Sequence, residues 1–199
     1  MKREELLRAI AEAGYNIGFG AKKHFATYDI IEKAPNWIGF ISFSIGVFGL
    51  IYDPLSTKAV SAALTVLGVS GLYVALYASN AAAYSKSGKG LTGHFDQLKL
   101  LYYLTKNASD DEVEANLIKL QEIQESAHEI GISKQIFPSD WYAHYKFFWQ
   151  HQIEWIDEQK NFRLFRDKIP LSLSILVTLA FIGVFWILAR GNFCTIVCP

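Results

Sequence analysis

Cysteine is almost missing from this chain of 199 residues. The only two, Cys194 and Cys198, lie at the C-terminal end, so a disulfide framework cannot hold the fold together. A charge excess of either sign is missing too, because 19 lysines and arginines balance 19 aspartates and glutamates. The balance argues against the basic surplus of a nucleic-acid-binding protein and the acidic surplus of a disordered tail. The N-terminus lacks the features of a signal peptide, so we expect no cleaved leader.

Motifs of catalysis and metal binding are missing as well. The chain has no His-Glu-x-x-His, no Gly-x-Ser-x-Gly and no Cys-x-x-Cys, and Gly88-Lys89-Gly90 lacks the spacing of a phosphate loop. Its five histidines are scattered, and the nearest pair, His144 and His151, is two helical turns apart. We therefore expect no metal site, no cofactor, no catalytic residue and no enzyme activity.

Hydrophobic residues, by contrast, make up 51% of the chain and gather in three uncharged runs. The first is Trp37 to Tyr52 and the second is Ala59 to Ser79, separated by the polar turn Asp53 to Lys58. Helices joined by so short a turn are antiparallel neighbours. The third run, Ile169 to Ala189, ends at Arg190. The lengths of these runs and the aromatic residues near their ends are typical of membrane-spanning helices. The alternative is a set of buried helices in a soluble bundle, and a third run makes that harder to accommodate.

The segment before the first run mixes apolar residues with charges. This pattern predicts an amphipathic lead-in helix over residues 1–36, broken or bent near Gly14, Gly18 and Gly20. Pro35 then marks the start of the first span.

Residues 80–168 form a polar region between the second and third runs. Glycine, serine and lysine in Ser85 to Gly93 predict a flexible exit from the membrane, followed by a short helix around Phe95 to Thr105. Another helix is expected from Trp141 to Lys168, continuing toward the third span with a break near Pro170.

A capping signal lies in the middle of this polar region. Ser109 and Glu112 have the spacing of a capping box, which predicts a helix that runs to about Ile130 and stops at Gly131. Its apolar positions step by threes and fours and present one stripe to a partner. The stripe consists of Val113, Leu117, Leu120, Ile123, Ala127 and Ile130.

The helix that follows is rich in aromatic residues interleaved with basic ones. Trp141, Tyr145, Phe148 and Trp155 lie near one stripe, and His144 and His151 are expected on a polar or interfacial face. Three interpretations are open: an interfacial or subunit-packing surface, a platform that stacks nucleic-acid bases, and core packing against the capped helix. Nearby acidic residues cancel the basic charge that nucleic acid requires, and core packing is the favoured interpretation.

Loop charges predict an orientation in the membrane. The lead-in carries six lysines and arginines and the polar region eleven, whereas the hairpin turn carries only Lys58 and the tail only Arg190. The positive-inside rule then places the lead-in and residues 80–168 in the cytoplasm, and the turn and tail outside, across an inner (plasma) membrane. In an oxidising space Cys194 and Cys198 could pair or link subunits; the alternative is two free or lipid-modified thiols.

The sequence therefore predicts an all-α integral membrane protein with a lead-in helix, a two-helix transmembrane hairpin, a cytoplasmic helical bundle and a third transmembrane helix. The expected segments are residues 1–36, 37–79, 80–168 and 169–190, with a short tail over 191–199.

Small residues are frequent in the hairpin and allow helices to approach closely. Two purposes are open. The small residues hold the two helices of one hairpin together, or they let several hairpins pack around an axis, with serine and threonine hydroxyls facing water in a pore. No charge lies within any span, so a proton relay has little support. The candidates for helix packing or pore lining are Gly39, Ser42, Ser44, Gly46, Gly49, Ser61, Thr65, Gly68, Ser70, Gly71, Ala75 and Ser79.

The lead-in segment Gly14-Tyr15-Asn16-Ile17-Gly18-Phe19-Gly20-Ala21-Lys22-Lys23-His24-Phe25-Ala26, followed by a short hairpin and a long helical region, resembles the SLATT family. The name stands for SMODS- and SLOG-associating two-transmembrane effectors. The resemblance covers roughly residues 1–165 and implies a bacterial membrane effector of nucleotide-signal conflict (antiphage) systems, with a sensor or nucleotide-synthesising partner protein. It carries over no catalytic residue, and the third span departs from the two of the family name.

These observations predict a non-enzymatic, homo-oligomeric effector that forms pores in, or disrupts, the membrane lipid. An alternative is a membrane scaffold that holds a soluble partner through the Val113 to Ile130 stripe and the aromatic helix. A third interpretation, an enzyme acting on lipid, would use Asp53, His94, His144 and Glu154, which form no motif.

Overall fold

A computed structural model of the chain describes residues 2–109 and 112–197, with side chains other than those of residue 165 and of residues beyond 186. All its regular elements are helical, so the all-α prediction is confirmed for these residues. The chain divides into two compact units, Met1–Lys160 and Asn161–Pro199. The first unit contains the helices α1 (Arg3–Gly49), α2 (Lys58–Ala75), α3 (Ala81–Lys106), α4 (Glu112–Ile130), α5 (Ser139–Phe148) and α6 (Glu154–Lys160), with short 3₁₀ turns at Asp53–Leu55 and Ala78–Asn80.

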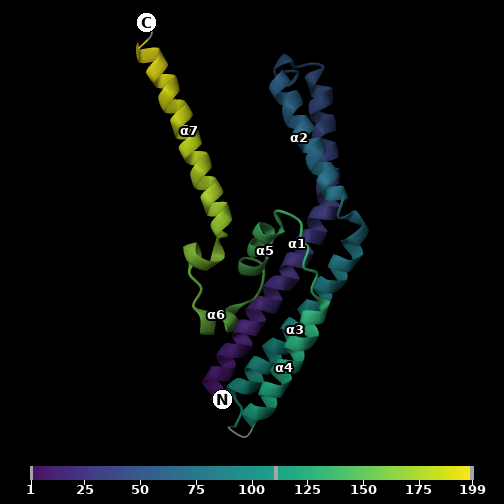
Figure 1. The fold of residues 1–199 in the computed structure, drawn as a ribbon, viewed down its shortest axis with the longest axis vertical. Coiled ribbons are helices and arrows are strands. Elements are labelled where there is room, and N and C mark those ends of the chain that lie inside the picture. Colours follow the sequence, from purple (N-terminus) through teal and green to yellow (C-terminus); the bar gives the residue numbers. More distant parts are fainter. Residues whose placement is uncertain (1, 110–111, 198–199) are drawn as a thin grey trace. The chain divides into compact units, whose positions relative to one another are not determined.

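Helix α1 is a single helix of 47 residues, and the expected break near its glycines is wrong. Gly14 and Gly18 lie within α1 and leave room for aromatic rings from other helices. A Cβ atom at Gly14 would lie 2.2 Å from the Trp155 ring, and one at Gly18 would lie 2.5 Å from the Phe95 ring. Pro35 is inside the helix, where it removes a single backbone donor. Lead-in and first apolar segment therefore form one continuous helix (Figure 1).

Helix α3 is also continuous, and the flexible exit expected over Ser85 to Gly93 is wrong. Gly88 lies against the ring of Phe25, whose nearest atoms would be 3.1 Å from a Cβ atom at this position, and Gly90 lies against Ile130. Glycine thus marks close contacts with α1 and α4 here, because the missing side chains let neighbouring groups approach the α3 backbone.

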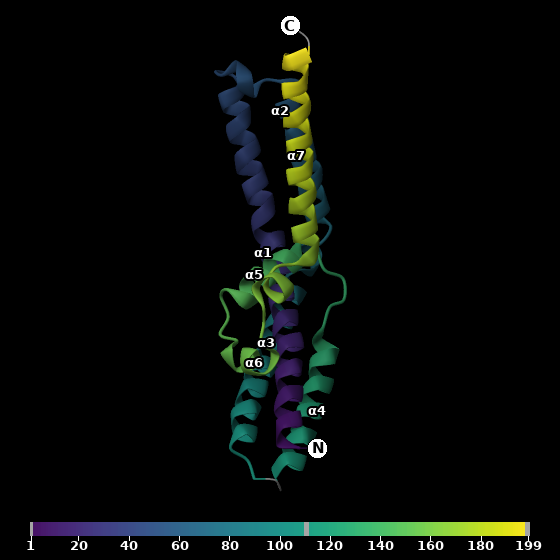
Figure 2. The same cartoon turned by 90° about the vertical axis from the view of Figure 1, so that its left-hand side faces the viewer.

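Helices α1, α3 and α4 lie side by side and form the centre of the bundle (Figures 1 and 2). Helix α4 ends at Ile130, as predicted, and the Ser109 backbone N–H donates to the Glu112 carboxylate at 2.8 Å. The hydrogen bonds from Ser109 lower the pKa of Glu112. The apolar stripe of α4 packs inward, with Val113, Leu120 and Ala127 buried. This stripe is therefore not free to hold a soluble partner.

The expected continuous helix from Trp141 to Lys168 is wrong, because the segment forms two helices, α5 and α6, and a separate π-helical turn after Asn161. Asn161 adopts a positive φ of 50°, a conformation that asparagine tolerates better than most residues and that ends the helix. Of the predicted stripe, Phe148 and Trp155 are buried, which agrees with core packing, whereas Trp141 is half-buried and Tyr145 is 52% exposed. Phe147, which lies outside that stripe, is also buried. The buried rings pack against α1 and α3, whereas the sequence predicted packing against the capped helix, α4.

The second unit contains a π-helical turn, Leu164–Lys168, and helix α7, Leu171–Val197. Leu171 to Trp186 is an apolar helix. The Cys194 side chain and all of Cys198 lie outside the described part of the chain, so their pairing remains a prediction.

Candidate functional site at the hairpin and its junction with the bundle

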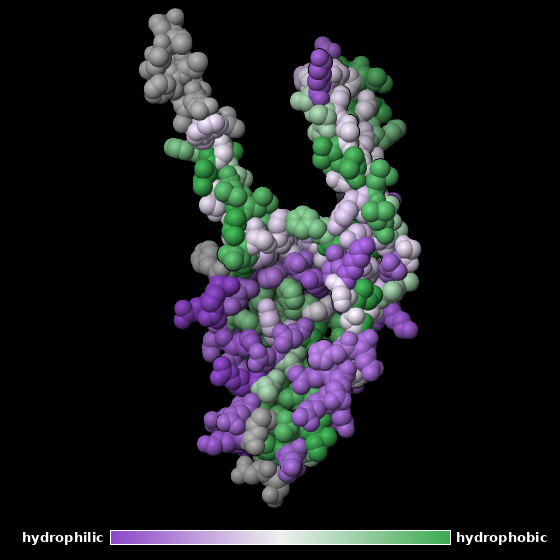
Figure 3. Space-filling model, in the orientation of Figure 1, coloured by the Kyte–Doolittle hydropathy of each residue, from purple (hydrophilic) through white to green (hydrophobic). Residues whose placement is uncertain are grey.

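The C-terminal part of α1 and helix α2 form a hairpin that carries most of the exposed apolar surface of the first unit (Figure 3). Trp37, Phe43 and Phe48 of α1 are 61%, 71% and 51% exposed, and Leu72 of α2 and Leu76, which follows it, are 71% and 73% exposed. So much apolar surface is unfavourable in water and suits a hydrocarbon environment. Lys58–Lys106, which contains α2, is the one described helical stretch long and apolar enough to cross a membrane. Crossing by α1 and α7 stays a prediction.

The predicted packing glycines occupy three kinds of position. Gly71 of α2 faces Ile38 of α1, with a Cβ position 3.8 Å from the Ile38 Cδ1 atom, and Gly49 faces the turn at Leu55. Gly39, Gly46 and Gly68 have no neighbouring atom within 4 Å of a Cβ position. The first two glycines therefore serve the hairpin itself, whereas the other three leave open surface on its outside.

The hydroxyl groups of α2 are satisfied within the helix. Ser61, Thr65 and Ser70 donate to the carbonyl oxygens of Thr57, Ser61 and Val66, at 3.3, 2.9 and 2.8 Å. Each hydroxyl thus has a partner one turn back and does not require water when it lies in lipid. The other small residues of the prediction are spread around the hairpin: Ser42 and Ser44 are half-buried, while Ala75 and Ser79 are exposed.

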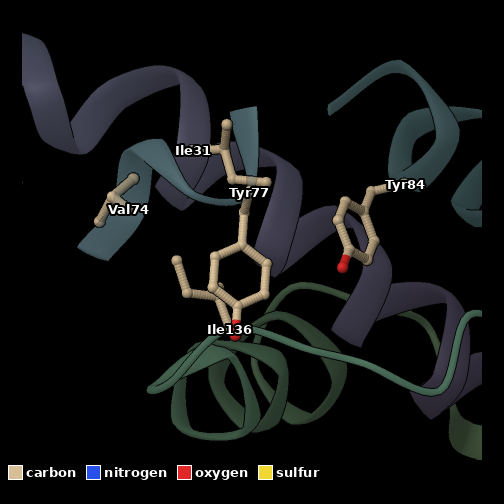
Figure 4. Close-up of a cluster of buried hydrophobic side chains, with 5 residues drawn as sticks. All are labelled: Ile31, Val74, Tyr77, Tyr84 and Ile136. Carbon is tan, nitrogen blue, oxygen red and sulfur yellow. The ribbon is translucent and has the colours of Figure 1, made fainter. Parts of the chain in front are cut away.

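A cluster of buried side chains joins the hairpin to the bundle (Figure 4). It contains Ile31 of α1, Val74 of α2, Tyr77, Tyr84 of α3 and Ile136 of the loop between α4 and α5. Elements from both parts of the first unit thus share one small core. The base of the hairpin cannot change its angle without disturbing this cluster, because packed cores do not deform continuously.

The loop between α4 and α5 is fixed to α1 by a buried polar network. The His24 Nδ1–H donates to the Gly20 carbonyl at 2.7 Å, and Nε2 accepts from the Ile132 backbone N–H at 2.9 Å. These partners require the neutral imidazole. Gln135 extends the network, since its amide oxygen accepts from the Thr27 hydroxyl at 2.6 Å. Burial lowers the pKa of His24, which keeps the ring neutral. We call these contacts the loop latch.

Two further contacts hold the end of α4 and the same loop to α3. The Ser87 hydroxyl donates to the Ile130 carbonyl at 2.9 Å, and the Tyr84 hydroxyl donates to the Lys134 carbonyl. No motif signals the loop latch in the sequence, because His24 and Thr27 pair with groups more than 100 residues away, one of them a backbone amide.

Helix α5 is attached to α1 close to the hairpin by two ion pairs. Lys146 binds Asp29, which also binds Lys33 at 2.9 Å, and Lys23 binds Asp140 at 2.8 Å. Burial works to raise the pKa of Asp29, but hydrogen bonds from Lys146 and Lys33 outweigh it and the pKa lies below its usual value. Asp29 and Lys146 are the more buried pair, with side chains 15% and 17% exposed.

The two histidines expected on a polar or interfacial face both contact aromatic rings instead. His144 lies edge-on to Phe19, with ring centroids 4.8 Å apart, and His151 lies 4.6 Å from the Phe95 ring. Burial and the nearby Lys22 charge lower the pKa of His151 to about 4. His151 is therefore a neutral packing residue at neutral pH.

The polar residues considered for lipid chemistry are not brought together. Asp53 is in the hairpin turn, His94 of α3 contacts Ser126 of α4, and Glu154 starts α6. Within residues 2–109 and 112–197, no group of three or more histidine, cysteine, aspartate or glutamate side chains could hold a metal ion.

Comparison with protein families gives one result. A family model described as "SMODS and SLOG-associating 2TM effector domain 6" matches residues 1–177, which include the hairpin, its junction and the whole bundle. No curated protein and no solved structure matches the chain.

Proposed function

The chain belongs to the SLATT family of two-transmembrane effector domains, and from this premise we propose that it is a homo-oligomeric effector that permeabilises the membrane in an antiphage system. The "2TM" of the family description agrees with a membrane location and with the hairpin of α1 and α2 as the spanning element. In this proposal the effector has no enzyme activity, and a sensor or nucleotide-synthesising partner protein supplies the signal.

The observation that carries the proposal is the continuity of the helices across the junction. Helix α1 passes without interruption from the bundle into the hairpin, and α2 joins α3 through only a short 3₁₀ turn. A helix transmits displacement along its length, so a shift within the bundle moves the hairpin. The loop latch and the cluster around Tyr77 then hold one arrangement of the two parts.

In this mechanism a signal bound by the bundle favours a second arrangement of the junction. The signal acts only through its higher affinity for that arrangement, which shifts the population of hairpins. Hairpins from several chains then pack through the open faces at Gly39, Gly46 and Gly68, where a neighbouring helix can approach closely. Since one chain has too few helices to enclose a channel, the pore belongs to the oligomer.

Orientation follows from the same proposal. The lysines and arginines of the lead-in and the polar region stay in the cytoplasm, where the signal is produced, and the hairpin turn at Asp53 faces outside. Helix α7 would then place the tail outside as a third span.

Expression in bacteria tests the proposal through Gly46, whose surroundings are empty in one chain. We expect the wild-type chain to depolarise the membrane when expressed at high level, and Gly46→Leu to abolish this while the protein still inserts. Val47→Leu is the matched control, because Val47 is 42% exposed and already carries a branched side chain. A wild-type chain that leaves the membrane potential intact, even together with its partner protein, would contradict the proposal.

A membrane scaffold is the second candidate, favoured by an exposed apolar stripe on the bundle. Leu100, Tyr103 and Leu104 lie on one face of α3 and are 63%, 46% and 52% exposed. This stripe replaces the α4 stripe, which is buried, as the surface for a soluble partner. A scaffold predicts that Leu100→Ser/Leu104→Ser loses its partner, and that reconstituted membranes stay tight with the wild-type chain and partner together.

A further inference from the structure

The elbow between α2 and α3 forms a polar cleft against α1, with a volume of about 640 Å³. Tyr28 and Glu32 of α1 lie on one side, and Ser79, Ser85, Lys86 and Lys89 lie on the other. The cleft is within the first unit and is separate from the loop latch, whose polar groups form hydrogen bonds with one another.

The charges that line the cleft are not balanced. Lys86 and Lys89, three residues apart on α3, lie on one face, and both are exposed. Within residues 2–109 and 112–197, neither lysine forms an ion pair. Glu32 is the only acid among the described residues of the lining, so the cleft carries a net charge of +1 and suits a ligand with a single negative charge. The Ser79 and Ser85 hydroxyls supply neutral donors beside the lysines.

The cleft lies where the apolar hairpin ends and the charged bundle begins. Leu72 and Leu76, at the end of the hairpin, are 71% and 73% exposed and come shortly before the cleft in the chain, while Lys86 and Lys89 line it from α3. Figure 3 shows the same change, from mostly hydrophobic residues on the hairpin to mostly hydrophilic ones on the bundle. In a membrane-inserted hairpin this level coincides with the lipid headgroups, and basic residues on the cytoplasmic side of a span attract anionic lipids.

We propose that this cleft binds the phosphodiester headgroup of an anionic phospholipid with one negative charge, such as a phosphatidylglycerol. The phosphate oxygens accept hydrogen bonds from Lys86, Lys89 and the serine hydroxyls, while the acyl chains extend along the hairpin. A bound lipid therefore contacts α1 and α3 together at the elbow. This site goes beyond the proposed pore and requires only that the hairpin is inserted in a membrane.

The test measures binding of dihexanoyl-phosphatidylglycerol, below its micelle concentration, to the full chain in neutral detergent by calorimetry. Dihexanoyl-phosphatidylcholine and inorganic phosphate are the comparison probes. We expect phosphatidylglycerol to bind more tightly than either. Each lysine near a membrane surface contributes about fivefold in affinity, so Lys86→Gln/Lys89→Gln should weaken binding roughly 25-fold.

Two variants make the test specific. Lys58→Gln/Lys119→Gln removes the same charge from exposed positions outside the cleft and should leave the affinity unchanged. Glu32→Gln removes the acid that faces the lysines and should tighten binding severalfold. Equal affinity for phosphatidylcholine, equal affinity for inorganic phosphate, or unchanged binding by Lys86→Gln/Lys89→Gln would each overturn the lipid site. Because the readout is binding, the result is independent of whether the chain permeabilises membranes.

Discussion

Gly14→Ala adds one methyl group where α1 packs against the ring of Trp155. The new Cβ would lie 2.2 Å from Cη2 and 2.9 Å from Cζ2 of Trp155, where carbon atoms normally stay about 3.5–4 Å apart. The indole cannot move aside easily, because Trp155 is 2% exposed and its ring contacts Phe95 and Tyr102, with centroids 5.5 and 5.3 Å away. The variant must therefore push a packed ring out of place.

Two opposing effects decide the magnitude. Overpacking a core costs about 1–3 kcal/mol, and a contact this short belongs at the upper end. Replacing glycine by alanine within a helix stabilises by about 1 kcal/mol. The net loss is about 2 kcal/mol, which lowers the thermal midpoint by about 4–8 °C for a chain of this size. Gly20→Ala is the matched control in the same helix: its Cβ would lie 3.8 Å from Leu91, an ordinary contact, so it should raise the midpoint by about 2–4 °C.

The assay is thermal unfolding of the full chain in detergent, followed by intrinsic fluorescence. Trp155→Leu provides the decisive background, because it removes the ring that the methyl group added by Gly14→Ala would strike. In that background Gly14→Ala should no longer be destabilising, a non-additivity of about 2 kcal/mol or more. If Gly14→Ala instead stabilises the wild-type chain as much as Gly20→Ala does, the close packing of α1 against α6 is refuted.

Three other predictions follow from the junction and the bundle. Since His24 and His151 have lowered pKa values, the unfolded chain binds more protons than the folded one between about pH 4 and 6.5. The free energy of unfolding is therefore highest above pH 6.5 and falls by about 2 kcal/mol or less toward pH 4. His151→Gln should flatten the dependence of the thermal midpoint on pH. Asp29→Asn leaves the mostly buried Lys146 without its ion pair and should lower the free energy of unfolding by about 2–4 kcal/mol. Asp140→Asn, at the more exposed pair with Lys23, should lower it by less than about 1 kcal/mol. Equal thermal midpoints for the two variants would contradict this difference. The helical part of the first span, Trp37 to Gly49, is only about 20 Å long, so leakage should be greater in bilayers of 14-carbon than of 22-carbon lipids, and a rise with thickness would contradict a thinned membrane.

The sequence predicted the elements whose signals are local. Helix α4 has a capping pair at its start, an apolar stripe along its length and a glycine after its end, and all three lie within about 25 residues. The turn at Asp53 likewise predicted the hairpin, because a short polar segment between two apolar runs leaves few alternatives.

What the sequence did not reveal depends on contacts between distant segments. Gly14, Gly18 and Gly88 resemble helix breaks when read locally, and only the rings of Trp155, Phe95 and Phe25 explain them. The break between α5 and α6 has no glycine or proline to mark it. The loop latch is equally hidden, since the partner of His24 is a backbone amide more than 100 residues away. Tertiary packing overrides local preference at each of these positions.

The most direct test of the proposed function is ion leakage from liposomes reconstituted with the purified chain, with the oligomer mass determined in the same preparation. We expect leakage from a defined oligomer, and a tight membrane with the Gly46→Leu variant. A monomer that leaves the liposomes tight in the presence of candidate nucleotides and partner proteins would contradict it and favour the scaffold.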